Sequence, residues 1–83
     1  MISTPSHPNY SKNRDRCGAA IPCVICGKAV TTANPAYIHL HNGGASIVTE
    51  TEAATMDAAA DLGLYPIGAD CLRRHPELRP YVQ

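Results

Sequence analysis

The clearest alternation of apolar and polar positions in the chain runs through residues 37–41. Tyr37, His39 and His41 fall on one side of this pattern, and Ile38 and Leu40 fall on the other. Because successive side chains of a strand point to opposite faces of a sheet, the alternation predicts a β-strand. Its aliphatic side chains then share one face, and the two histidines share the opposite face.

A turn signal follows this strand immediately. Asn42, Gly43 and Gly44 are residue types that tolerate the positive φ angles of tight hairpin turns. Residues 46–49 are again suited to a strand, because three of the four are β-branched. The two strands and the turn together predict a β-hairpin.

The next stretch predicts a helix over residues 49–62. Thr49 and Glu52 have the spacing of a capping box, in which each side chain bonds the backbone N–H of the other residue. The alanine-rich run that follows has high helix propensity, and Gly63 stands where a helix would end. The stretch has no basic residue and carries four of the seven acidic residues: Glu50, Glu52, Asp57 and Asp61. We expect a solvated helix face, with an acidic docking surface as the alternative.

The C-terminal part of the chain predicts an extended piece and a short helix. Residues 64–67 favour an extended conformation, and Asp70 can cap a helix that begins near Cys71. Pro76 and Pro80 keep this helix short, because proline in a helix interior removes a backbone hydrogen bond.

The beginning of the chain differs in composition from the rest. Residues 1–20 are polar and rich in proline, serine and asparagine. A basic cluster flanks Asp15 and consists of Lys12, Arg14 and Arg16. A segment of this kind adds few side chains to a core, so we expect a flexible N-terminal arm. Residues 21–83 are then expected to form a single domain.

The small size of the folded part limits its stability. The chain has 83 residues, of which 45% are apolar, but alanine inflates this fraction and there is no Trp or Phe. Such a chain buries too little apolar surface to be comfortably stable without a disulfide or a metal. A structural zinc ion contributes on the order of 10 kcal/mol to folding. The formal net charge is zero, which argues against a nucleic-acid binder.

The four cysteines supply candidate metal chemistry. Cys23 and Cys26 form a Cys-x-x-Cys turn followed by Gly27, which lets the backbone fold back so that both thiolates face one tetrahedral ion. Cys71 is expected in the first turn of the last helix, where the helix dipole favours a thiolate. Cys17 lies in the arm and is expected to be unligated.

The redox compartment decides between zinc and disulfides. The chain opens without an apolar signal segment and has no apolar run of membrane-spanning length. We therefore expect a cytoplasmic protein without membrane contact. In that reducing compartment the cysteines favour Zn²⁺ as cofactor over two disulfides, so we expect residues 21–83 to be a zinc-binding domain.

A fourth ligand is needed to close a four-coordinate zinc site, and three histidines are candidates. His39 and His41 lie on one face of the predicted strand, which is expected to pass behind the turn. His75 follows Cys71 by four positions, so both lie on the same face of the last helix. Spacing alone favours His75, but the residues leave all three possibilities open.

The order of these features resembles the treble-clef group of zinc fingers: a Cys-x-x-Cys-Gly turn, a hairpin, and a helix that opens with a ligand. More narrowly, three segments are similar to those of small uncharacterised zinc proteins of phages and plasmids: Tyr37-Ile38-His39-Leu40, Asn42-Gly43 and Gly63-x-Tyr65-Pro66-Ile67-Gly68-x-Asp70-Cys71. The resemblance covers residues 21–75, and the alanine-rich residues 53–60 depart from it. It implies that the fourth ligand is the strand histidine, which makes the metal set Cys23, Cys26, His39 and Cys71.

Three catalytic classes fit these residues poorly. A zinc deaminase shares the Pro-Cys-x-x-Cys pattern at Cys23 but needs an upstream ligand with a nearby glutamate, which the arm lacks. An HNH-type nuclease needs a paired His-His or Asp-His on the strand, where this chain has Leu40. Redox use of Cys23 and Cys26 requires a βαβ setting. We expect no enzymatic activity and no catalytic residue, with a degenerate HNH-type nuclease as the second alternative.

The sequence therefore predicts a small α+β, treble-clef-like domain with a zinc knuckle, a β-hairpin and a short C-terminal helix. A site filled entirely by Cys and His leaves no open position for water, so the zinc is expected to be structural. The resemblance to proteins of mobile elements implies an interaction with another protein, such as a host complex. The first alternative is nucleic-acid binding through the seven basic residues: Lys12, Arg14, Arg16, Lys28, Arg73, Arg74 and Arg79.

Overall fold

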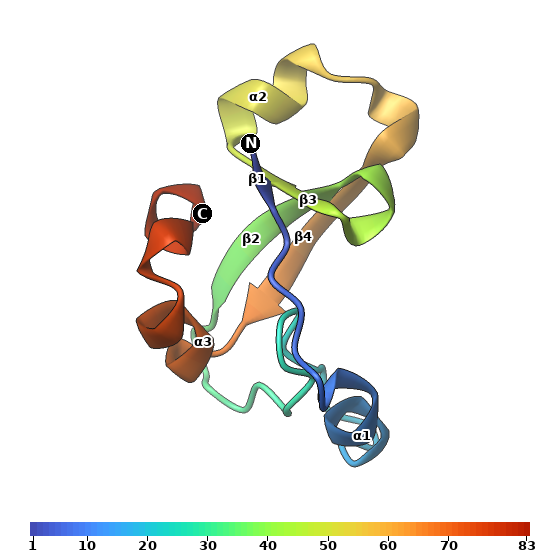
Figure 1. The fold of residues 1–83 in the computed structure, drawn as a ribbon, viewed down its shortest axis with the longest axis vertical. Helices are drawn as coiled ribbons and strands as arrows, with labels where there is room; N and C mark the ends of the chain where they lie inside the picture. Colours follow the sequence, from blue (N-terminus) through green and yellow to red (C-terminus); the bar gives the residue numbers. More distant parts are fainter.

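A four-stranded sheet organises the chain, of which residues 1–83 are all described by a computed structural model (Figure 1). The strand order is β1-β3-β2-β4, and every neighbouring pair is antiparallel. The strands are β1 (Ile2–Ser3), β2 (Ala36–His41), β3 (Ser46–Val48) and β4 (Asp61–Ile67). The α-helices are α1 (Tyr10–Asp15), α2 (Glu50–Thr55) and α3 (Ala69–Arg74), and short 3-10 helices span Asn42–Gly44, Ala58–Ala60 and Pro76–Tyr81. The prediction of a small α+β domain is confirmed.

The molecule is elongated, with extents of 36 × 24 × 24 Å. Figure 1 shows α2 at one end of the long axis and α1 at the other end, with the sheet between them. Each α-helix has only six residues. No helix of this structure has the length and apolar character that crossing a membrane requires.

The predicted hairpin is formed by β2 and β3. Leu40 of β2 lies opposite Ile47 of β3, and the turn between the strands contains Gly43 and Gly44, both at positive φ. Ile38, Leu40 and Ile47 are buried in the core. The apolar face of the alternating strand therefore packs inward, as its pattern predicts.

The alternation of β2 breaks at its last residue. Leu40 lies opposite Gly63 of β4, but His41 lies opposite Asp61, so Leu62 has no partner on β2. Such an extra residue is a β-bulge, which redirects the side chains beside it. His41 is only 4% exposed and does not follow the exposure of the other residues on its predicted face.

The predicted helix over residues 49–62 is wrong beyond its first turns. The capping box of Thr49 and Glu52 is present and starts α2, but α2 ends at Thr55. Met56 then adopts an extended conformation, and residues from Asp61 onward pair with β2. The helix ends early because of a tertiary interaction: the hydrogen-bonded pairing of residues 61–67 with β2 outweighs the helix propensity of the alanines. Gly63 consequently lies inside β4.

The N-terminal arm also differs from the prediction, because it contains regular structure. Ile2 of β1 lies opposite Ile47 at the edge of the sheet. Thr4 extends this contact, since its hydroxyl donates to the Gly44 carbonyl (2.6 Å). The composition of the arm does not predict these interactions, because a strand of two residues needs only one well-placed apolar side chain.

The C-terminal segment covers the rest of the β2 edge. Helix α3 is short, as predicted, but the Asp70 side chain pairs with Arg73 instead of capping the helix. After the 3-10 helix Pro76–Tyr81, Val82 pairs with Ile38 beyond the end of β3. The chain thus closes a part of the sheet that β3 is too short to reach.

Candidate metal centre

Backbone hydrogen bonds close residues 21–30 into a tight turn, which we call the knuckle. The Cys23 N–H donates to the Lys28 carbonyl (2.7 Å), and the Gly27 N–H donates to the Cys23 carbonyl (2.9 Å). Gly27 has a φ of 81°, which glycine adopts without steric cost. Both cysteines of the knuckle, Cys23 and Cys26, are buried.

The junction of β4 and α3 carries the third cysteine to the knuckle. The Val24 N–H donates to the Pro66 carbonyl (3.0 Å), and the Gly68 N–H donates to Cys23 Sγ (3.2 Å). These two bonds hold the knuckle against the end of β4. Cys71 lies in the first turn of α3, as predicted, and is buried.

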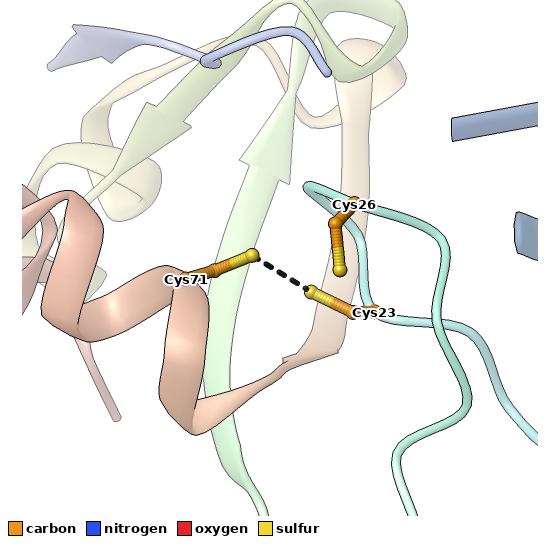
Figure 2. Close-up of side chains that lie close together, drawn as sticks. All are labelled: Cys23, Cys26 and Cys71. Carbon is orange, nitrogen blue, oxygen red and sulfur yellow. Dashed lines mark hydrogen bonds between the residues drawn. The ribbon is translucent and has the colours of Figure 1, made fainter. Parts of the chain in front are cut away.

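The three sulfur atoms of Cys23, Cys26 and Cys71 lie within 4.8 Å of one another. Figure 2 shows their side chains pointing toward a common centre, two from the knuckle and one from α3. Cys23 Sγ and Cys71 Sγ are 3.8 Å apart. Thiolates bound tetrahedrally to zinc at about 2.3 Å lie roughly 3.8 Å apart. The cluster therefore has the size and the donor chemistry of a metal site.

Burial and hydrogen bonding set opposite ionisation tendencies for two of these thiols. Burial disfavours a Cys23 thiolate, but N–H donors from Cys26, Gly68 and Ile25 outweigh this effect and lower the pKa of Cys23. Burial and the neighbouring Cys23 raise the pKa of Cys71 to about 12. The two neighbouring thiols therefore do not readily ionise together. A bound dication favours the ionised form of both, because it stabilises both thiolates at once.

His39, the ligand implied by the resemblance, is not brought to the sulfurs by this structure. Its Nε2 atom contacts a carboxylate oxygen of Asp61 across β2 and β4. This hydrogen bond, together with the Gly63 N–H, lowers the pKa of Asp61. The group of atoms within 4.8 Å contains Cys23, Cys26 and Cys71 but no histidine.

The two other histidines considered from the sequence also have partners elsewhere. His41 Nε2 lies 3.0 Å from the Asp57 carbonyl, and its buried Nδ1 atom has no hydrogen-bond partner. His75 Nδ1 lies 3.3 Å from a carboxylate oxygen of Glu77. Neither ring belongs to the cysteine cluster.

Helix α1 packs directly on the knuckle, an arrangement that the sequence does not predict. The Asn13 side-chain amide donates to the Cys26 carbonyl (2.8 Å), and the Cys17 thiol donates to the Gly27 carbonyl (3.1 Å). A Cβ atom on Gly27 would lie 2.4 Å from the Tyr10 carbonyl oxygen. The Cys17 thiol thus bonds the backbone of the knuckle, and it lies outside the sulfur cluster.

A cavity of about 200 Å³ adjoins the three sulfurs. Its wall contains Lys28 and Arg74, the carboxylate-bearing Asp70, and His7 from the N-terminal arm. His7 is the functional candidate that the sequence missed. No spacing pattern could have indicated it, because it lies in a segment that composition places outside the fold.

Comparison of the chain with models of protein families, with curated proteins and with solved structures finds no match. What the structure defines is a small α+β domain in which three buried cysteines can hold a metal ion.

Proposed function

We propose that the chain is a non-catalytic zinc module in which the metal ties the knuckle to α3. The observation that carries this proposal is the convergence of three buried sulfurs from two distant parts of the sequence. Thiolates in tetrahedral geometry favour zinc among the available cations. The order of knuckle, hairpin and ligand-bearing helix supports a treble-clef-like arrangement.

The size of the core supports a structural role for the metal. Only 13 of the 83 residues are buried, and three of them are the clustered cysteines. An apolar core this small contributes little stability beyond the conformational entropy that folding loses. A zinc ion in this position supplies on the order of 10 kcal/mol, which is comparable to the total stability of an ordinary domain.

The proposed partner is another protein, and strand β4 supports this part of the proposal. β4 is an edge strand, and its Leu62 and Leu64 side chains are 42% and 52% exposed. Tyr65 beside them is also exposed. An edge strand with exposed apolar side chains suits strand addition by an extended segment of a partner protein.

Nucleic-acid binding is a second candidate, favoured by the placement of three basic residues. Lys28 and Arg74 line the cavity beside the three sulfurs, and Lys28 and Arg16 line an adjoining hollow. Arg73, in contrast, pairs with Asp70. If this candidate is right, duplex or single-stranded DNA binds at low salt and affinity falls steeply as salt rises.

Metal content tests the leading proposal. Elemental mass spectrometry of the purified protein should give one zinc per chain, and Cys71→Ser should lose both the zinc and the cooperative thermal transition. Cys17→Ser is the matched control and should keep the zinc, because the Cys17 thiol contacts only backbone carbonyls of Gly27 and Asn13. Wild-type protein without metal, or Cys71→Ser with full zinc content, contradicts the proposal.

A further inference from the structure

We infer that His7 is the fourth protein ligand of the metal, so that metal binding fastens the N-terminal arm to the knuckle. This inference rests on the proposed zinc site. It concerns a histidine that neither the ligand spacing nor the family resemblance points to.

The arm is held on both sides of His7. Before it, the Thr4 N–H donates to the Ala45 carbonyl (3.0 Å), which continues the pairing of β1 with β3. After it, α1 is docked on the knuckle through Asn13 and through the close approach of Tyr10 to Gly27. His7 lies in the short stretch between these two anchors, and it lines the cavity that the three cysteines also line.

The cavity wall places His7 with the sulfurs. Cys23, Cys26 and Cys71 all line the cavity that His7 lines, and no other histidine does so. His7 is partly buried. His7 therefore shares this cavity with the sulfurs but lies outside the group of ligand atoms within 4.8 Å of one another, so a local rotation of the arm has to bring a ring nitrogen to the metal.

The hydrogen bonding of the His7 ring allows this rotation. Its Nδ1 atom accepts a hydrogen bond from the Asn9 N–H (3.1 Å), which places the ring proton on Nε2 in the metal-free state. The Nδ1 lone pair that accepts this bond can bind the metal instead while the proton stays on Nε2, so the bond to Asn9 is exchanged for a metal–nitrogen bond. The loss is small, because the Asn9 bond is exposed to solvent.

Charge favours His7 over Asp70, the other possible donor in the wall. Three thiolates on a dication already leave a net negative charge, which the nearby Lys28 and Arg74 can balance. A neutral imidazole leaves that charge unchanged, whereas a fourth anionic ligand increases it. The Asp70 carboxylate is also engaged by Arg73.

Cobalt substitution tests this assignment. With Co²⁺ in place of zinc, the visible absorption bands of a tetrahedral site report the number and type of its ligands. His7→Ala should change these bands and weaken zinc binding by about 100-fold or more, since even partners outside the ligand shell are typically worth 10- to 100-fold. His39→Ala and His75→Ala are matched controls and should leave both the bands and the affinity as in wild type.

Two further measurements keep the test decisive. His7→Cys should restore tight binding and strengthen the sulfur-to-cobalt charge-transfer absorption, even if His7→Ala folds poorly. Hydrogen exchange should show amides of residues 5–16 gaining protection when zinc is added to wild type but not to His7→Ala. Unchanged bands and affinity in His7→Ala, or their loss in His39→Ala or His75→Ala instead, overturn the inference while leaving the zinc site intact. A wild-type protein that binds no metal overturns the zinc site itself.

Discussion

The two ends of the molecule are stabilised in different ways. At the cysteine end, contacts join segments far apart in the sequence, such as Cys23 with Cys71 and Asn13 with Cys26. At the α2 end, contacts are mostly local: Thr49 bonds Glu52, and the Asp57 side chain bonds the Ala59 N–H. Neither α2 nor the 3-10 helix after it contains a buried residue.

The two ends therefore depend on different kinds of interaction. The α2 end depends on capping and turn chemistry, which acts over a few residues and can be recognised in the sequence. The cysteine end depends on burial and on convergence, and in our proposal on a metal. Two side-chain contacts from distant residues reach the α2 end. The Met1 amino group contacts the exposed Glu52 carboxylate, and His41 Nε2 lies 3.0 Å from the Asp57 carbonyl. Substitutions at the cysteine end should therefore lower the free energy of unfolding more than substitutions at the α2 end.

The largest of these effects is expected for Gly27→Ala. The substitution forces alanine into a positive φ and drives its Cβ against the Tyr10 carbonyl, so α1 has to move. We expect zinc-loaded protein to lose about 2 to 4 kcal/mol of unfolding free energy in urea titrations. Gly43→Ala is the control, because Gly43 has a φ of 68° but no atom within 4 Å of the added Cβ. Its loss should be only about 1 to 2 kcal/mol, and equal losses at both glycines would show that α1 does not press on the knuckle.

A smaller effect is expected at the other end for Thr49→Ala. The substitution removes the hydroxyl that accepts from the Glu52 N–H (3.1 Å), and loss of such a cap costs about 1 kcal/mol. Thermal unfolding should detect this change, while zinc content stays at the wild-type level. Thr51→Ala in the exposed part of α2 is the control and should be neutral or slightly stabilising. Zinc loss in Thr49→Ala would break the separation between the two ends.

The smallest effect concerns the His39–Asp61 pair between the two ends. The hydrogen bond from His39 lowers the pKa of Asp61, so the ionised carboxylate stabilises the fold above its unfolded pKa of about 3.9. That stability is lost as pH falls through the lower folded value. NMR shifts of the Asp61 carboxyl should hardly move toward pH 4.5 in wild type and should begin to move in His39→Ala. Identical titrations in the two proteins would exclude the pair as the cause.

The sequence was sufficient where a short pattern is specific. The alternation through Ile38 and Leu40, the glycine turn and the capping box at Thr49 each lie within a few residues, and all three are present in the structure. The three cysteines were identified in the same way, because Cys-x-x-Cys-Gly and a cysteine in a first helical turn are local features. The sequence signals for these features each span only a few residues.

Tertiary contacts determined the features that the sequence did not predict. Residues 61–63 have neighbours that favour a helix, but pairing with β2 makes them a strand. The first residues of the chain carry no strand pattern, but Ile2 meets Ile47 at an open sheet edge. The histidines are the strongest example, because His39 contacts Asp61 while His7 lines the same cavity as the three cysteines. The physical reason is that a metal site is defined in space, and ligands from separate segments become neighbours only after the chain has folded.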